Sequence, residues 1–266
     1  MSQNKKKYLT AQEIDGFTGI KSPHARELHE IGKTKVALFV KEKKRRIKII
    51  VEEDLLGILE DLGFDEDYTL TLEYFPEVRS HIIYTNYEDE AFGGAELKFL
   101  FSGERVAWVP TEDLIGLLEA SLDYLEDLLE DTQEHHYLPP EKSDLLNQSI
   151  KQRAGPFVHL KSEQLKDLAS FIGGKIAQKD DLWELSKTLF QGFNIILIYD
   201  VGNKRLDVQY GGENILKINN YARDYLGIFL INHCLRFISI TYPNIKMPKI
   251  VGQVFSYSYL KTYQKV

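Results

Sequence analysis

Two acidic residues on a predicted β-hairpin are the first candidates for chemistry in this chain. Asp200 and Asp207 fall on neighbouring strands predicted within residues 194–210. Two carboxylates placed in this way can hold a divalent ion for phosphodiester cleavage. Such a site would use a lysine two residues after the second acid, but Gln209 stands there. A metal-dependent nuclease is therefore an alternative hypothesis, weighed against an ordinary exposed hairpin.

A cluster of cations suggests a second kind of site. Residues 41–46 contain five Lys or Arg residues at a predicted turn between two strands, and such a turn could lie along phosphates. The turn holds no aromatic residue for base stacking, and the segment that follows it is acidic. Nucleic-acid binding through Lys43, Lys44, Arg45 and Arg46 is thus disfavoured against a turn that balances nearby acids.

The other reactive residue types form no catalytic or cofactor motif. Cys234 lies in an apolar helical stretch, where a neighbouring histidine points about a quarter-turn away. His135 and His136 are adjacent and lack the i, i+4 spacing of a zinc helix. The sequence 173–176 resembles the end of a phosphate loop but has Ile176 in place of Ser or Thr. We expect no metal, no cofactor and no catalysis.

Charge is sorted along the chain. Residues 1–51 hold 13 basic and 5 acidic residues, residues 52–141 hold 3 and 25, and residues 142–266 hold 17 and 10. A helix predicted at 111–131 has leucines on one stripe and acids on the other. Its last turn is acidic, which the helix dipole opposes, so this end should attract a cation. The acidic face consists of Glu119, Asp123, Glu126, Asp127, Glu130 and Asp131.

The charge pattern favours a non-catalytic binding protein, such as an assembly factor, adaptor or inhibitor, that offers this acidic face to a basic protein partner. A further alternative is that the basic segments clamp the acidic one, within one chain or across a homodimer. The single cysteine and the polar start predict a cytoplasmic protein. The most apolar window, 225–240, is shorter than a membrane span.

Residues 46–60 and 105–119 are similar in sequence, with a fainter copy at 223–229. This similarity predicts a duplicated strand-to-helix unit. Gly57, Gly116 and Gly227 recur in the copies, which suggests close packing at a helix surface.

The sequence predicts an α+β fold with duplicated β-hairpin-plus-helix units, mostly antiparallel sheets and two domains. The predicted domains are a basic extension (1–33), an acidic domain (34–131), a linker (132–156) and a C-terminal domain (157–266). The predicted strands are 36–40, 47–51, 68–75, 81–87, 96–101, 105–109, 194–199 and 205–210. The predicted helices are 52–62, 111–131, 162–178, 180–190 and 219–240. The tail at 249–263 is rich in β-forming residues.

Overall fold

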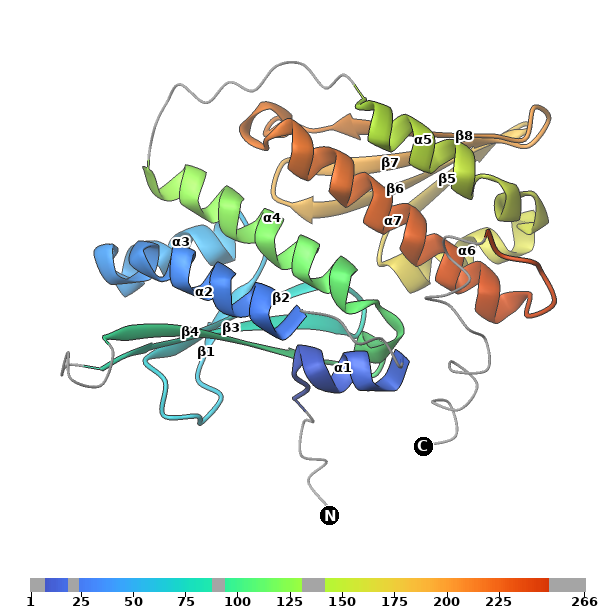
Figure 1. Cartoon of the computed structure of the whole chain (residues 1–266). Helices are drawn as coiled ribbons and strands as arrows, with labels where there is room; N and C mark the ends of the chain where they lie inside the picture. Colours follow the sequence, from blue (N-terminus) through green and yellow to red (C-terminus); the bar gives the residue numbers. More distant parts are fainter. Residues whose placement is uncertain (1–7, 19–23, 88–93, 131–141, 249–266) are drawn as a thin grey trace, which may run out of the picture. The chain divides into compact units, whose positions relative to one another are not determined.

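The computed structural model describes residues 8–18, 24–87, 94–130 and 142–248. The fold is α+β, with helices and two four-stranded antiparallel sheets (Figure 1). The chain divides into two compact units, unit 1 (Met1–Gln133) and unit 2 (Glu134–Val266). Each unit contains one sheet.

Unit 1 begins with helices, continues through an antiparallel sheet and ends with a long helix. The sheet order is β1-β2-β3-β4. The elements are α1 (Ala11–Thr18), α2 (His24–Lys41), α3 (Lys44–Glu53), β1 (Ile58–Glu60), β2 (Tyr68–Phe75), β3 (Val78–Asn86), β4 (Ala95–Ser102), the 3-10 helix η2 (Val106–Trp108) and α4 (Thr111–Glu130).

Helices α2, α3 and α4 cover one face of this sheet (Figure 1). The hydroxyls of Tyr74 on β2 and Ser121 on α4 lie 3.1 Å apart. Since side chains alternate along a strand, Thr71 and Glu73 point to the opposite face. The hydrophobic core therefore lies between the sheet and α2, α3 and α4.

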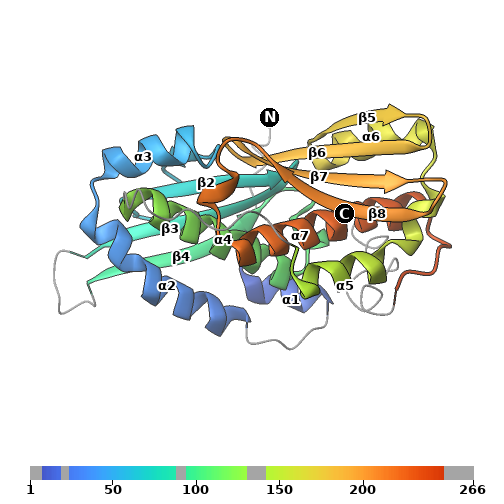
Figure 2. The ribbon, with the colours of Figure 1, turned by 90° about the horizontal axis from the view of Figure 1, so that it is seen from above.

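Apart from α1 in unit 1 and a 3-10 helix between the first two helices of unit 2, unit 2 has the same order of elements, and its sheet order is β5-β6-β7-β8 (Figure 2). The elements are α5 (Asp144–Arg153), the 3-10 helix η3 (Gly155–His159), α6 (Ser162–Ile172), β5 (Lys175–Lys179), β6 (Leu182–Phe190), β7 (Phe193–Asp200), β8 (Arg205–Gly211), the 3-10 helix η4 (Ile215–Lys217) and α7 (Asn220–Thr241). Here α5 contacts β8 and α7, as α2 contacts β4 and α4 in unit 1.

The two units repeat each other in register. The hairpin β2–β3 closes with the pair Phe75–Val78 after a bulge, and β6–β7 closes with Phe190–Phe193 after the same bulge. The chain then leaves each sheet through a glycine with positive φ, Gly103 or Gly212. A Cβ at Gly103 would lie 2.2 Å from the carbonyl oxygen of Glu77, and one at Gly212 would lie 2.1 Å from that of Gly192. The same backbone crossing thus occurs in both units.

The predicted duplication at 46–60 and 105–119 is wrong. The first segment forms most of α3, a loop and β1, whereas the second forms η2 and the start of α4. Gly57 lies in the loop before β1, whereas Gly116 lies in α4 and Gly227 lies in α7, where an added Cβ would be close to Val208 and Tyr210. The fainter copy does fall on α7, the counterpart of α4.

The first predicted strands are also wrong, because residues 36–40 and 47–51 lie in α2 and α3. Their β-branched residues favour strands, but the buried side of each helix decides the structure. The helix predicted at 52–62 is instead the end of α3, a loop and β1. Residues 1–33, the predicted basic extension, include α1 and the start of α2.

Other corrections concern strands and helices around the second sheet. Residues 105–109 contain η2 in place of the predicted strand. The helix predicted at 162–178 ends at Ile172 and gives way to β5, and residues 180–190 form β6. The expected linker contains α5. The tail at 249–263 lies outside the described residues.

The remaining strands and the two long helices are confirmed. They correspond to β2, β3, β4, β7 and β8, and to α4 and α7. These elements have the clearest alternation or the longest apolar stripes.

Candidate functional site

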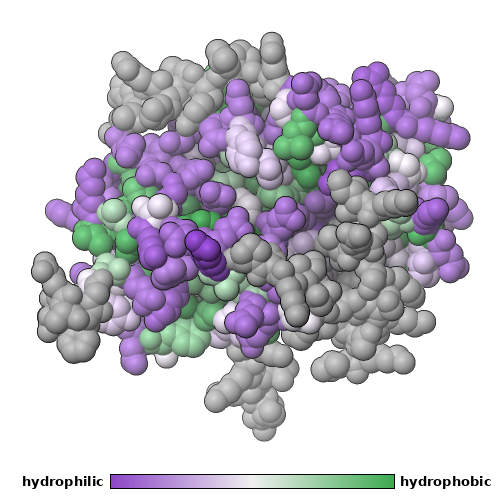
Figure 3. Space-filling view, in the orientation of Figure 1, coloured by the Kyte–Doolittle hydropathy of each residue, from purple (hydrophilic) through white to green (hydrophobic). Residues whose placement is uncertain are grey.

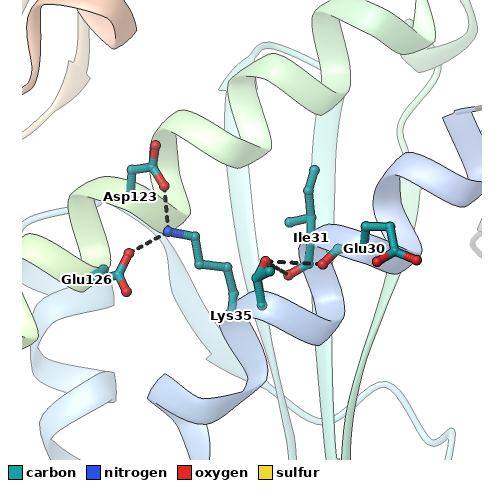
Figure 4. A network of polar contacts seen from close by, with 6 residues as sticks. Glu30, Ile31, Lys35, Asp123 and Glu126 are labelled. Atoms are coloured by element: carbon teal, nitrogen blue, oxygen red, sulfur yellow. Dashed lines mark hydrogen bonds and ion pairs between the residues drawn. The ribbon is translucent and has the colours of Figure 1, made fainter.

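The acidic face of α4 is partly neutralised inside unit 1. Lys35 on α2 donates to Asp123 at 2.6 Å and to Glu126 at 2.5 Å (Figure 4). Burial lowers the pKa of Lys35, but the hydrogen bonds that Lys35 donates to Asp123 and Glu126, together with their charges, outweigh it and raise the pKa overall. Two of the predicted partner-binding acids therefore already hold a lysine of the same chain.

The other predicted acids have different surroundings. Glu119 is exposed, and its pKa is raised by partial burial and by the charges of Asp123 and Glu27, with Lys35 acting in the opposite direction. Asp127 is half-buried and Glu130 is exposed at the end of α4. Asp131 lies outside the described residues. Negative charge thus remains on this face after the Lys35 contacts.

The predicted basic turn is the corner between α2 and α3. Arg46 donates to the carbonyl of Leu129 at 2.6 Å, which supplies the cation expected at the end of α4. Lys44 donates to the carbonyl of Asp67 and stands over the ring of Tyr68. Lys43 and Arg45 are exposed. The cluster is thus divided between internal contacts and solvent.

The two aspartates of the β7–β8 hairpin are engaged by neighbouring side chains. Asp200 accepts from the backbone and side-chain nitrogens of Asn203, and these bonds lower its pKa. Asp207 pairs with Lys142. Among the described residues, no three His, Cys, Asp or Glu side chains gather as metal ligands. The hairpin offers no metal site within this part of the chain.

The remaining candidates that fall in the described part of the chain form no catalytic cluster. Cys234 is buried in α7, and burial raises the pKa of its thiol. His233 stacks on Phe171 and contacts Arg236. Gly173 and the following residues end α6 and start β5. His135 and His136 lie outside the described residues.

The structure brings together four polar residues on the sheet face of unit 1 that points away from α4. Glu60 and Thr71 are joined at 2.5 Å between Oε1 and Oγ1. Thr71 Oγ1 lies 2.7 Å from His81 Nδ1, and His81 Nε2 lies 2.7 Å from Ser102 Oγ. We call these residues the Glu60 chain.

The direction of each hydrogen bond follows from the Glu60 carboxylate, which can only accept. The Thr71 hydroxyl must donate to Glu60, so it accepts from Nδ1–H of His81. With a neutral imidazole ring, Nε2 of His81 then accepts the proton of Ser102. Serine, histidine and acid have the same bond directions in hydrolase relays, but His81 and Ser102 are each 0% exposed. In this conformation the chain orients Glu60 and presents no nucleophile.

The ring of Tyr8 lies against His81, and Phe64, in the loop before β2, lies against Tyr8. The ring of Tyr8 meets His81 edge-on at 5.1 Å and contacts Phe64 at 5.4 Å. Glu66 accepts from the amides of Leu62 and Phe64 and from Thr69. Burial opposes ionisation of Glu66, but these donors outweigh it and lower its pKa. The loop is therefore organised around a carboxylate.

A cavity of about 170 Å³ opens beside Glu60. Its polar lining is Thr71, Glu60, Glu73 and Arg79, and the Arg79 guanidinium lies 2.8 Å from Glu73. Its remaining lining is Leu56, Gly57 and Ile58. Because Thr71 and Glu60 belong to both features, the Glu60 chain ends at the cavity wall.

Unit 2 has neither the Glu60 chain nor a carboxylate at the position of Glu60. Strand register places Ala177 where unit 1 has Glu60, Ser186 where it has Thr71, and Ile196 where it has His81. Gly211 takes the place of Ser102. The fold therefore does not require the Glu60 chain, which points to a role specific to unit 1.

This site was not predicted because its four residues lie far apart along the chain. One feature is unusual. Thr71 and His81 are polar residues within otherwise apolar strands, on the sheet face that points away from the helices. Both are buried, whereas side chains on a solvated sheet face would be exposed.

The chain matches no family model, no curated protein and no solved structure in the comparisons. Within the described residues, every helix is too short or too polar to cross a membrane.

Proposed function

We propose that this chain is a non-catalytic binding protein whose unit 1 receives a basic protein partner on the surface of α2 and α4. The supporting residues are Glu27, Glu119, Asp123 and Glu126, which we call the acidic ridge. Lys35 contacts two of them and carries one positive charge against four carboxylates. The ridge therefore keeps an excess of negative charge.

The observation that carries the proposal is the presence of four carboxylates near one lysine, with Lys35 Nζ at 2.6 Å from Asp123 and 2.5 Å from Glu126. Partial burial and the charges of Asp123 and Glu27 raise the pKa of Glu119 even with Lys35 nearby, so its ionisation is less favourable than in water. A cation docked on the ridge would relieve this repulsion. Free energy that the unbound protein loses to repulsion would thus be recovered on binding.

The charge balance of the chain agrees with this proposal. Unit 1 holds 16 basic and 28 acidic residues, a net charge of −12, whereas unit 2 holds 17 and 12, a net charge of +5. The two units share a fold, so the fold itself does not demand the acidic excess. Figure 3 shows hydrophilic residues over much of the described surface in view.

The test uses capture of proteins from an extract of the native cells at low salt, with a nuclease-treated sample in parallel. The double variant Glu27→Gln/Glu119→Gln spares both Lys35 contacts. Glu52→Gln/Glu53→Gln on α3 removes the same charge elsewhere in unit 1. We expect a basic protein to be captured by the unaltered chain and by the α3 variant, to be lost with the ridge variant, and to elute as salt rises.

Equal capture by both variants would contradict the proposal, because net charge alone would then explain it. Capture that disappears with nuclease would favour the nucleic-acid alternative. That alternative has less support here, since Lys44 and Arg46 make contacts within unit 1.

A further inference from the structure

We propose that the cavity beside Glu60 binds a lysine or arginine side chain of a partner polypeptide that lies along β1. This site is on the sheet face opposite α4, so it is separate from the acidic ridge and does not depend on it.

The cavity is large enough to admit a side chain. Its volume of about 170 Å³ is well above the ~10–15 Å³ that one water molecule needs in such a cavity. One long side chain could enter it and replace several water molecules.

The rim of the cavity is apolar and exposed. Leu56 is 46% exposed and Ile58 is 51% exposed, and both line the opening. Unit 2 has Gly173 and Lys175 at the corresponding positions, since Gly57 and Gly174 make the same close approach to Thr71 and Ser186. Apolar side chains at this rim are therefore particular to unit 1.

Leu56 is held in a conformation that leucine disfavours. Its φ is 56°, where Gly173 in unit 2 has a φ of 67°. A non-glycine residue in this region costs about 1–2 kcal/mol. Such strain collects at ligand sites, and here it places an exposed leucine at the mouth of a cavity.

The inner wall carries a fixed negative charge. The Glu60 chain directs its hydrogen bonds toward the Glu60 carboxylate. Glu73 pairs with Arg79 at 2.8 Å and accepts the amide of Glu77. One carboxylate in excess of the single guanidinium thus remains at the cavity, and a cation would balance it.

An apolar rim and an anionic wall together fit a side chain with an apolar stem and a cationic tip. Lysine and arginine have this form. A polypeptide is the expected source because β1 is an edge strand that pairs with β2 alone among the described strands. An extended segment could pair with that edge and insert one side chain.

The test measures binding of the full chain to a short extended peptide with arginine at its centre. A matched peptide has citrulline, which keeps the shape of arginine but has no charge. Binding is followed by the methyl NMR signals of Leu56 and Ile58. We expect the arginine peptide to shift both signals saturably and the citrulline peptide to bind at least about tenfold more weakly.

Three variants locate the effect. Glu60→Gln should weaken arginine-peptide binding about tenfold or more, whereas Glu53→Gln, an exposed acid on α3, should leave it unchanged. Leu56→Gly should weaken binding while raising Tm, because glycine relieves the backbone strain. Loss of binding with a gain in stability cannot come from unfolding.

Equal binding of both peptides would overturn the proposal, as would unchanged binding by Glu60→Gln. So would the absence of any saturable shift at peptide concentrations up to about 5 mM, well above the weak end of specific binding at ~1 mM. The ridge variant Glu27→Gln/Glu119→Gln should bind the peptide normally. If the ridge variant fails to capture the partner protein in the first experiment, the peptide-binding result would therefore be unaffected.

Discussion

Arg153 donates from Nε to Oδ1 of Asn232 at 2.9 Å and so joins α5 to α7. Lys35 and Asp123 make the corresponding contact between α2 and α4. The positions agree because Val109 and Ile218 end equivalent 3-10 helices, so that Asp123 and Asn232 fall at the same place in α4 and α7. The buried residues before each cation have the same spacing: Leu28, Ile31 and Gly32 in α2, and Leu146, Ser149 and Ile150 in α5.

This shared contact predicts that Lys35→Met destabilises the protein. The change leaves Asp123, Glu126 and Glu119 without their shared cation, and we expect a loss of about 1–3 kcal/mol in the free energy of unfolding near pH 7. Urea denaturation measures it. Lys33→Met, which removes an exposed pair with Glu30 on the same helix, should change stability by less than about 0.5 kcal/mol.

The pH dependence of this effect follows from the raised pKa of Lys35. A lysine whose pKa is higher in the folded state stabilises that state fully below its unfolded value of 10.5. The contribution is lost as pH rises through the folded pKa. Above pH 6, the stability difference between the unaltered chain and Lys35→Met should therefore shrink only in strongly alkaline solution, and a difference that shrinks between pH 6 and 8 would contradict this account.

Glu119→Gln should have the opposite sign. Burial, Asp123 and Glu27 raise the pKa of Glu119, so its ionisation destabilises the folded state. At pH 7 the variant should be more stable than the unaltered chain, by a few tenths of a kcal/mol for an exposed residue. The gain should disappear as pH falls below the unfolded value of 4.5. A gain that persists in acid would mean that the charge is not its cause.

Much of the architecture was predictable, but its repeat was not found in the right place. Alternating strands such as β2 and the stripe of α4 follow from local pattern. Residues 46–60 and 105–119 look like a repeat because their apolar residues have similar spacing. The same spacing can occur in different secondary structures, as it does here. The true signal is shorter: Gly103-Glu104 and Gly212-Glu213 stand after matching strands, with an apolar residue two positions later in each case. This Gly-Glu motif is too short to be recognised in the sequence unless the backbone crossing that requires its glycine is already known.

The candidate site was less predictable than the fold. The acidic residues of α4 follow from the sequence, but their pairing with Lys35 depends on how α2 packs. Glu60, Thr71, His81 and Ser102 come from four strands and meet only through strand register. No local pattern of residue types could indicate that contact, because strand pairing is a non-local event.

The shared glycines should be among the most sensitive positions in each unit. Gly103→Ala and Gly212→Ala would place a Cβ within 2.2 Å and 2.1 Å of a carbonyl oxygen, at φ values of 114° and 105°. We expect each change to cost more than about 2 kcal/mol, or to prevent folding of its unit. Circular dichroism and thermal unfolding would show this. Gly16→Ala, in α1 with no atom within 4 Å of the added Cβ, should be neutral or stabilising.

Thr71→Val tests whether the Glu60 chain is continuous. The substitution keeps the shape of the side chain but removes the hydroxyl that joins Glu60 to His81. It takes one acceptor from the buried His81 ring and one donor from Glu60, so we expect a loss of about 1–3 kcal/mol in the free energy of unfolding.

The matched control is Ser186→Ala, at the same register in unit 2, where Ile196 faces it in place of histidine. Ser186 is half-buried, and its loss should cost under about 0.5 kcal/mol. The second readout is the Nδ1 proton of His81, which should be protected from exchange in the unaltered chain and lose that protection in Thr71→Val. If both variants were equally stable and the proton equally protected, Thr71 would not connect His81 to Glu60, and the orientation of Glu60 would need another cause.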